Sequence, residues 1–419
     1  MRVQSCKGTR DLSPQNMIGF RLIEEAFRDC CLKWGYEEVR TPTLEYLHLF
    51  TSTGTLTPGM LHRVYSFLDW DGWSGERVVL RPDGTIPIAR LYNESMSKKE
   101  LAKLFYVTNI FIFEETGKKT RERWQCGVEL IGAGCPLADV ELITLALTVL
   151  KNLGLEGIRL KLSHAGLIRA LLTRLSLSPG EQARIFDQIL DGDVKALARI
   201  KPGRPELGRA LRSLLDLKGK KSGFLKNMEA LLTQDLPELK PYLDDFSGVA
   251  TLLEALDCDY QIDITSGRGF EYYTGVIFQL HKGKEKIGGG GRYDALIPLM
   301  GGRDVPASGF ALYLDPLIDL VKSGALAKPL APRILITAEP EAMSQGFGIA
   351  SRLRDASYVA ELNLGGREVN DFRWALDVCH KSPQFVLTDQ IKQRKFELKS
   401  AEEVLALLGE EGADKDSST

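Results

Sequence analysis

The chain has 419 residues, of which 44% are hydrophobic and 26% charged, and its 54 basic and 56 acidic side chains give a net charge of −2. This composition supports a sizeable core in two or three domains, excludes wholesale disorder, and provides no global positive field for nucleic acids. No apolar run approaches the ~18 residues of a membrane span, the first residues lack an apolar signal-peptide core, and seven scattered cysteines indicate reduced thiols, so we expect a cytoplasmic protein without membrane contact.

The N-terminal part of the sequence predicts both helices and short strands. Residues 15–34 carry apolar side chains three and four positions apart, which predicts a helix. Residues 36–50 begin as an extended chain. A strand at Val78–Leu80 then leads through a tight turn to Thr85, which we expect to cap a short helix.

The most informative short segment is a pair of predicted strands, residues 103–113 and 122–131, joined by a charged loop. The short connection predicts an antiparallel hairpin. Alternation along the second strand places Gln125, Gly127 and Glu129 on one face. Gly127 leaves a slot between an amide and a carboxyl, which suits the ammonium group of a small zwitterion. A solvated strand face explains the pattern equally well.

The middle of the chain predicts one sheet interrupted by helices. Residues 139–162 indicate an apolar helix followed by a strand. Residues 166–256 are rich in leucine, lysine and glutamate with scattered prolines, which predicts a helical insertion. Strands return at 260–265, at 271–281 and from 287 onward, so the insertion divides the sheet in sequence.

The C-terminal part predicts a separate small domain. A proline-bearing linker at 325–332 precedes residues 333–408, which alternate between strand and helix. We expect helices near 342–355 and 367–379 between the strands of a parallel-type sheet. Residues 409–419 are polar and predict a frayed tail.

Further candidate ligand contacts lie at two glycine-bearing turns. Asp83 and Thr85 flank a strand-to-helix turn with exposed N–H groups, although helix capping explains Thr85 better. Arg268 stands between two glycines and is able to approach an anion, or else faces water. Tyr272 and Tyr273 are expected on opposite faces of a strand, one in the core and one offering its hydroxyl to a pocket.

Other kinds of site are poorly supported. The run Gly288–Gly291 lacks the Walker pattern, and close backbone packing explains its glycines more simply than a phosphate cradle does. The five histidines form no metal-binding motif, and no G-x-S-x-G elbow is present. We therefore expect no metal, no cofactor and no catalytic residue of these types.

Taken in order, these segments resemble the histidyl-tRNA synthetase family over nearly the whole chain. The matching motifs are KGTRDL at 7–12, TPTLE at 41–45, LRPDGT at 80–85, QCGVELIG at 125–132, RGFEYYTGVIF at 268–278, GGRYDALI at 290–297 and GF at 309–310. The resemblance implies an α+β class II synthetase fold, with an antiparallel sheet flanked by helices. TPTLE is similar to the family's dimerisation motif and implies a dimer.

The resemblance also implies domain limits and a histidine pocket. The synthetase-like core would comprise residues 1–165 and 257–324, with the insertion at 166–256 and a degenerate anticodon-binding-like domain at 333–408. Matched by position, the histidine-binding residues would be Asp83, Thr85, Gln125, Glu129, Arg268, Tyr272 and Tyr273. Position 83 holds aspartate where the synthetases carry glutamate.

Two departures from the family pattern bear on function. The stretch 109–115, where an active synthetase has an arginine, contains none, and Pro316 stands where the last motif has its arginine. Adenylate formation needs fixed cations on the ATP phosphates, and each lost contact costs roughly 3–4 kcal/mol. Lys118, Lys119 or Arg121, in or next to the charged loop, are the alternative cations that could replace the missing arginines. Residues 331–408 carry ten basic and eleven acidic side chains, which makes a tRNA partner unfavourable.

A chain that keeps the family's motifs but lacks these arginines is similar to the synthetase-like regulatory subunits of ATP phosphoribosyltransferase. The similarity implies a subunit without chemistry of its own, which assembles with a short-form catalytic subunit as a dimer within a larger hetero-oligomer. It would serve the first step of histidine biosynthesis, with histidine as a feedback effector. The alternatives are an active or diverged histidine–tRNA ligase, and a synthetase-like ligase acting on another substrate.

Overall fold

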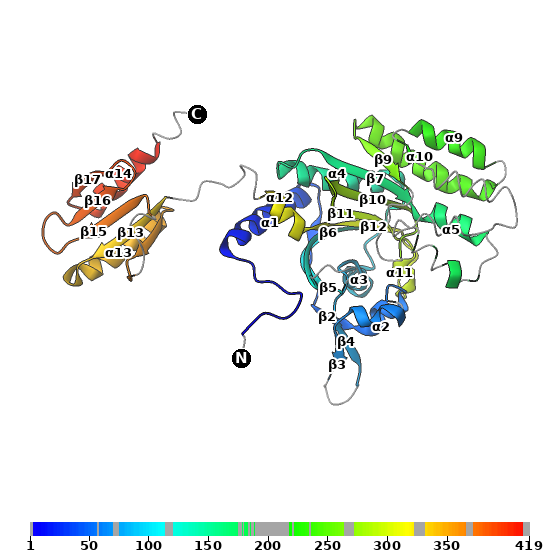
Figure 1. Ribbon diagram of the computed structural model, residues 1–419, viewed down its shortest axis with the longest axis horizontal. Coiled ribbons are helices and arrows are strands. Elements are labelled where there is room, and N and C mark those ends of the chain that lie inside the picture. The colour runs from blue at the N-terminus through cyan, green and yellow to red at the C-terminus, as the bar shows by residue number, and fades with distance from the viewer. Residues whose placement is uncertain are drawn as a thin grey trace. The chain divides into compact units, whose positions relative to one another are not determined.

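The computed structural model of the chain divides into two compact units, Met1–Leu326 and Ala327–Thr419 (Figure 1). It describes residues 3–56, 58–69, 75–113, 120–174, 178, 180–182, 185, 188, 218–219, 222–233, 236–263, 272–321, 332–365 and 372–413. Several predicted features fall outside these residues: the loop at 114–119, much of the insertion, Arg268, most of the linker and the last part of the tail.

The first unit is built on a nine-stranded sheet in the order β1-β5-β6-β12-β11-β10-β7-β9-β8. Its strands are β1 (Glu37–Glu38), β5 (Ala102–Phe111), β6 (Glu122–Ile131), β7 (Ile158–His164), β8 (Lys218–Gly219), β9 (Tyr260–Asp263), β10 (Val276–Lys282), β11 (Glu285–Arg292) and β12 (Ala307–Tyr313). All neighbouring pairs are antiparallel except β1–β5 and β7–β9. The predicted hairpin of β5 and β6 is confirmed.

Helices cover the two faces of this sheet (Figure 1). One core joins α1 (Pro14–Lys33), α4 (Pro136–Asn152), α10 (Lys240–Ala255) and α12 (Leu314–Val321) to the even-numbered side chains of β6, from Cys126 to Leu130. A second core joins α3 (Thr85–Leu91), η2 (Tyr92–Met96) and α11 (Leu296–Leu299) to Tyr106 and Ile131. The period-2 pattern of β6 therefore separates two differently covered faces.

The described part of the predicted insertion is mainly helical. It contains α5 (Ala165–Thr173), α9 (Ser222–Leu232), the short η3 (Pro237–Leu239) and α10, together with β8 at the edge of the sheet. Leu243, Phe246 and Val249 of α10 are fully buried against the main core. Among the described helices, none has the length and apolar character needed to cross a membrane.

A small three-stranded sheet, in the order β2-β4-β3, stands apart from the large one. Its strands are β2 (Leu44–Tyr46), β3 (Ser66–Leu68) and β4 (Arg77–Leu80), with α2 (Leu47–Ser52) and η1 (Pro58–Arg63) between them in sequence. The register pairs Tyr46 and Phe67 with Val78, so these side chains share a face with Leu44. Leu44, Tyr46 and Phe67 are each 46–47% exposed, which leaves an apolar face uncovered.

The second unit contains a five-stranded sheet in the order β14-β13-β15-β16-β17. Its elements are β13 (Arg333–Ala338), η4 (Pro340–Ala342), α13 (Met343–Asp355), β14 (Val359–Leu362), β15 (Trp374–Val378), β16 (Phe385–Asp389), β17 (Arg394–Leu398) and α14 (Ala401–Ala413). Both helices share one core with the sheet. The first three strands are parallel and the last two antiparallel, so the sheet is mixed and not parallel throughout.

Two predictions for this unit are wrong. The helix expected at 367–379 is the strand β15 over its described part, because Trp374, Leu376 and Val378 alternate and are all buried. The expected frayed tail begins too early, since α14 continues to Ala413.

Candidate functional site

A buried polar cluster lies on the face of β6 that is turned toward α3. Gln125 is 5% exposed and Glu129 only 1%, although both are polar. The predicted placement of these two residues on one strand face is confirmed, and the alternative of a solvated face is wrong. Polar groups at this depth require partners, because burying them unpaired costs free energy.

Two tyrosines supply the partners of Glu129. The hydroxyl of Tyr106 on β5 donates to Glu129 Oε1 at 3.0 Å, and the hydroxyl of Tyr293, after β11, donates to Oε2. The Tyr106 oxygen also lies 3.4 Å from Gln125 Nε2. Neither tyrosine was identified from the sequence, because their contacts with Glu129 span 23 and 164 positions.

The slot predicted at Gly127 exists but is occupied by the Tyr106 ring. A Cβ atom at Gly127 would lie 2.1 Å from Tyr106 Cζ, far inside van der Waals contact. The register of the hairpin places Tyr106 directly opposite Gly127. A glycine facing an aromatic residue across two antiparallel strands was therefore the available signal for this tyrosine.

The turn before α3 contributes a second buried carboxyl. Asp83 is 4% exposed, and its Oδ1 accepts a hydrogen bond from the Ile86 N–H at 2.9 Å. The N-cap of α3 is Gly84, and Asp83 accepts the Ile86 N–H from the position before it. The prediction that Thr85 is the cap is wrong, because Thr85 is the first helical residue. Its side chain instead helps to lower the pKa of the Glu129 carboxyl.

Tyr272 and Tyr273 close the cluster from the chain segment before β10. They precede that strand, which begins at Val276, so their expected placement on a strand is wrong. The Tyr272 hydroxyl is 3.5 Å from Asp83 Oδ2, and its ring meets those of Tyr273 and Tyr293 at centroid distances of 5.2 and 5.5 Å. The structure thus brings together six of the seven predicted residues; Arg268 lies outside the described residues.

The cluster is acidic and has no cation among its described partners. Burial raises the pKa of Glu129 to about 8, and hydrogen bonds from Tyr293, Thr85 and Tyr106 only partly offset it. Burial also raises the pKa of Asp83 to about 6, against the opposing effect of backbone N–H groups. Among the described residues, no lysine, arginine or histidine forms an ion pair with either carboxyl. Such a site suits a ligand that supplies positive charge.

A second buried polar cluster adjoins the first through Arg292, the neighbour of Tyr293. Its guanidinium binds both Asp139 on α4 and Asp245 on α10, the latter at 3.1 Å. His164 Nε2 lies 3.3 Å from Asp245, while its Nδ1 accepts the Leu167 N–H. Burial raises the pKa of Asp245, but the bond to His164 and the charge of Arg292 outweigh it and lower that pKa.

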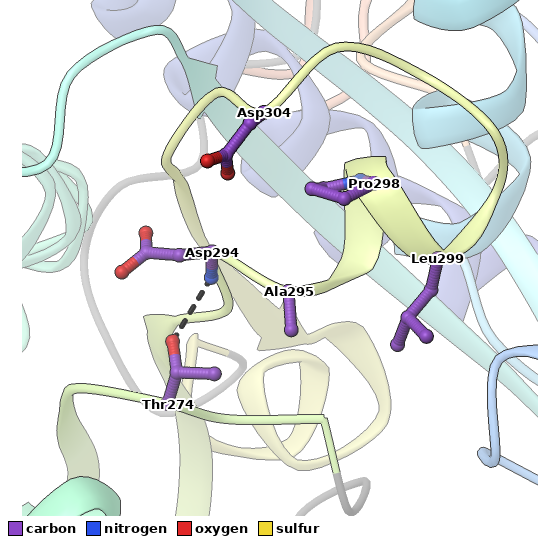
Figure 2. A pocket seen from close by; sticks show the side chains of 6 residues that line it. All are labelled: Thr274, Asp294, Ala295, Pro298, Leu299 and Asp304. Carbon is purple, nitrogen blue, oxygen red and sulfur yellow. Dashed lines mark hydrogen bonds between the residues drawn. The ribbon is translucent and has the colours of Figure 1, made fainter.

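An open hollow of about 550 Å³ lies beside these clusters (Figure 2). Its lining residues are Thr274, Asp294, Ala295, Pro298, Leu299 and Asp304. The backbone N–H of Asp294 donates to Thr274 Oγ1 at 2.9 Å, and Asp294 Oδ1 accepts the Ala307 N–H. None of the predicted site residues lines this hollow, so it is distinct from the buried cluster around Glu129.

The glycine run Gly288–Gly291 lies within β11, between β10 and β12. A Cβ at Gly290 would stand 2.1 Å from the Gly309 carbonyl oxygen. Close backbone packing is therefore the reason for these glycines, as predicted, and the run forms no phosphate cradle. Among the described residues, no three His, Cys, Asp or Glu side chains are arranged to hold a metal ion.

Comparison with known proteins agrees with this geometry. The family model described as histidyl-tRNA synthetase matches residues 8–317. A protein from Dehalococcoides mccartyi strain BAV1, named ATP phosphoribosyltransferase regulatory subunit, is 52% identical over 98% of this chain and 100% of its own length. The chain belongs to this regulatory subunit family. The family's name supports a non-catalytic role for this regulatory subunit.

The wider relatives of the regulatory subunit are synthetases. A histidine–tRNA ligase from Methanosarcina acetivorans is 33% identical over 85% of this chain and 84% of its own length. A solved structure from Bacillus halodurans, an ATP phosphoribosyltransferase regulatory subunit/histidyl-tRNA synthetase, superposes with a TM-score of 0.77 at 24% identity, covering 91% of this chain and 100% of that one. The predicted class II synthetase fold is thereby confirmed.

Proposed function

We propose that this regulatory subunit assembles with a short catalytic subunit and supports the transfer of a phosphoribosyl group from PRPP to ATP, the first step of histidine biosynthesis. The observation that carries the proposal is the full-length match, at 52% identity, to a protein named as the regulatory subunit of that enzyme. The chain performs no chemistry itself and acts through the assembly.

Two segments, the C-terminal end of β5 and the start of α12, support the proposal that the chain has lost the adenylate chemistry of a synthetase. Ile110 and Ile112 are buried apolar side chains in the stretch where a synthetase carries its arginine. Asn109 is already engaged with Arg81 and Glu122. Pro316 follows an aspartate that pairs with Arg10 at the start of α12. Each missing phosphate contact would cost roughly 3–4 kcal/mol of transition-state stabilisation.

We further propose that the cluster around Glu129 and Asp83 is the histidine effector site, with Thr85, Gln125, Tyr272 and Tyr273 as its other described members and Arg268 as a seventh. The two buried carboxyls, which pair with no cation in the described part of the chain, support this assignment because they suit an ammonium group. Feedback inhibition then requires that histidine binds two states of the hetero-oligomer with different affinity.

A dimer is supported by the exposed apolar face of Leu44, Tyr46 and Phe67. Leu44 belongs to the segment at 41–45 that resembles the dimerisation motif, and Tyr46 follows that segment directly. Covering this face would remove apolar surface from water. The variant Leu44→Glu/Tyr46→Glu should sediment as a monomer in analytical ultracentrifugation. Leu256→Glu, at a 56% exposed leucine elsewhere, is the matched control and should leave the dimer intact. An unchanged sedimentation coefficient in both variants would contradict this interface.

The test of the main proposal is reconstitution with a short catalytic subunit. Pyrophosphate release from PRPP and ATP should require this chain, and histidine should inhibit the complex. Gln125→Ala should weaken that inhibition while leaving the uninhibited rate in place. Equal rates with and without the chain would refute the regulatory role. Feedback unchanged by Gln125→Ala would refute the pocket as the histidine sensor.

An active histidine–tRNA ligase is the second candidate, favoured by the relatives of that name at 33% identity. ATP–pyrophosphate exchange dependent on histidine distinguishes it, because only adenylate formation produces that exchange. We expect none; robust exchange would establish the ligase. The same assay with the other amino acids tests a ligase of different specificity.

We also infer a cytoplasmic location and no tRNA partner. All seven cysteines are free thiols, which is the usual state in a reducing compartment. The near balance of charge over residues 331–408 supports the absence of tRNA binding. A filter-binding assay with total tRNA at 150 mM salt, where we expect no retention, checks the second point.

A further inference from the structure

The open hollow beside the buried clusters has an apolar side that the fold presents to solvent (Figure 2). Leu296 and Ile297 of α11 are fully buried, so these two side chains anchor the short helix in the second core. Pro298 and Leu299, the next residues, line the hollow, and Leu299 is 55% exposed. An exposed leucine in the wall of a hollow is apolar surface that a group of another molecule would cover.

Two carboxyl groups also line the hollow. Figure 2 shows the side chains of Asp294 and Asp304 on one side of it and those of Pro298 and Leu299 on the other. Asp294 Oδ1 accepts the Ala307 N–H at 3.1 Å, which fixes this carboxyl in place. An ionised carboxyl accepts about four hydrogen bonds, so Asp294 keeps capacity for a cationic donor. The hollow therefore combines an apolar side with an acidic side.

The loop that carries Asp304 is held by contacts with η2 and the residues after it. Arg303 Nη2 donates to the Tyr92 hydroxyl at 3.0 Å and to the Lys99 carbonyl oxygen at 2.9 Å. Gly302 packs so closely on η2 that a Cβ atom there would lie 2.1 Å from a side-chain atom of that helix. The acidic side of the hollow is therefore formed before any partner binds, which lowers the entropy cost of docking.

We propose that this hollow is a docking point for the catalytic subunit and that its occupant is an arginine side chain of that subunit. The proposal rests on the proposed function and adds the surface at which the two subunits meet. The aliphatic stem of an arginine covers apolar surface, while its planar guanidinium bonds carboxylates through parallel N–H groups. This side chain therefore matches a proline and a leucine on one side and two aspartates on the other.

The size of the hollow and the chain's own arginines support this occupant. A stable interface buries about 800 Å² on each partner, so a hollow of about 550 Å³ serves as an anchor within a larger contact. Arginine is enriched in interfaces, whereas lysine is depleted there. Arg292 binds Asp139 and Asp245, and Arg303 makes the bonds described above, so neither of these neighbours supplies the charge to the hollow.

The first experiment titrates the full chain into the catalytic subunit and follows pyrophosphate release. The chain concentration that gives half-maximal release should rise at least about tenfold for Asp304→Arg at about 50 mM salt, because repulsion replaces attraction. Added salt should reduce the difference, since it screens exposed charges. Asp355→Arg, at an exposed aspartate of the second unit, is the control and should leave that concentration unchanged. An unchanged value for Asp304→Arg overturns the proposal.

The second experiment tests the apolar side with a matched pair of variants. Leu299 and Leu256 are 55% and 56% exposed, so alanine at either position should leave the chain folded. Leu299→Ala should raise the half-maximal concentration about threefold or more, because it removes apolar contact from the docked side chain. Leu256→Ala should not change it. Equal values for the two variants would show that the hollow is not part of the interface.

The third experiment identifies the occupant by exchanging charges. The arginines of the catalytic subunit are changed singly to aspartate and each variant is combined with Asp304→Arg. One combination should recover most of the lost affinity, because the ion pair is restored in reverse. Recovery by none of them overturns an arginine as the occupant.

Amide hydrogen exchange needs no variant. Exchange over residues 294–304 should slow in the complex with the catalytic subunit and stay unchanged when the chain alone is concentrated. Slowing in the concentrated chain alone would identify a second copy as the occupant and overturn the proposal. Assembly without slowing at 294–304 overturns the docking point and leaves the proposed function standing. A chain that does not bind the catalytic subunit at all refutes the proposed function and the docking point with it.

Discussion

Two buried acid clusters lie next to each other in the first unit, and they are satisfied in opposite ways. Asp139 and Asp245 share the guanidinium of Arg292. Glu129 lies next to this cluster because it binds Tyr293, the residue that follows Arg292 in the chain. Among the described residues, the side chains that donate hydrogen bonds to Glu129 do so through hydroxyl groups. Within the described part of the chain, one cluster therefore pairs its acids with an arginine and the other does not.

This difference is the one that we expect between a structural role and the binding role proposed above. The Arg292 cluster joins α4, α10 and β11, and it is complete without a ligand. The Glu129 cluster holds its acids at a cost in desolvation that a cationic ligand would relieve. Acids with a perturbed pKa are typical of functional sites, but burial raises the pKa of the paired Asp139 as well, to about 7, so the presence or absence of a partner is the clearer difference between the clusters.

The largest expected effect comes from removing the cation of the paired cluster. Arg292→Met leaves Asp139 buried without its cation and leaves Asp245 with His164 alone, and breaking a buried ion pair typically costs about 3–5 kcal/mol. Urea unfolding followed by circular dichroism should register this loss in the first unit. The matched substitution Arg303→Met, at a loop arginine that bonds Tyr92 and Lys99, should cost much less. A loss below about 1 kcal/mol for Arg292→Met would show that the pair is not a structural anchor.

For the cluster around Glu129, we expect an effect of pH on the free energy of unfolding. The pKa of Glu129 is about 8 in the folded chain and about 4.3 when unfolded, so the folded state binds more protons between those values. The contribution of Glu129 to stability should therefore fall as pH rises from about 5 to 8, by at most about 1.4 kcal/mol per unit, and level off above pH 8.

Glu129→Gln removes this titration and isolates its contribution. The variant's unfolding free energy should decline less than that of the wild type between pH 5 and 8, as measured by urea unfolding at each pH. The isosteric amide keeps the shape of the side chain, so the difference between the two curves reports the carboxyl. Parallel curves would mean that Glu129 is already ionised in the folded chain.

The sequence predicted the strand face that forms this site better than it predicted the side chains that contact that face. Alternation along residues 122–131 correctly placed Gln125 and Glu129 together, because strand periodicity is local. Tyr106 and Tyr293 were missed because their position depends on the order β5-β6-β12-β11, which no local pattern encodes.

The errors of prediction have a similar origin. Trp374–Val378 has apolar residues at spacings that a helix and a strand both allow, and only its neighbours β13 and β16 settle the choice. Thr85 is a good capping residue in isolation, but the carboxyl of Asp83 reaches the Ile86 amide. In both places tertiary contacts override a sound local preference.

A smaller effect should follow from filling the slot on β6. Gly127→Ala places a methyl group 2.1 Å from Tyr106 Cζ, and overpacking of this kind costs about 1–3 kcal/mol. It should also weaken histidine binding, because Tyr106 must move to relieve the contact. Gly223→Ala, in α9 with open space around its Cβ, is the control and should not destabilise the chain. Equal stability of the two variants would contradict the packing of Tyr106 on Gly127.

The smallest expected change in stability comes from replacing an aspartate by asparagine, a substitution that can be made in both clusters and compared. Asp83→Asn keeps an oxygen for the Ile86 N–H, so stability at pH 7 should change by less than about 1 kcal/mol. Asp139→Asn removes a charge from the Arg292 pair and should cost about 1.5–3 kcal/mol, as expected for a hydrogen bond to a charged group. Thermal unfolding of the two variants side by side measures both. Equal losses would mean that Asp83 is as firmly paired as Asp139, and the distinction between binding acids and structural acids would fail.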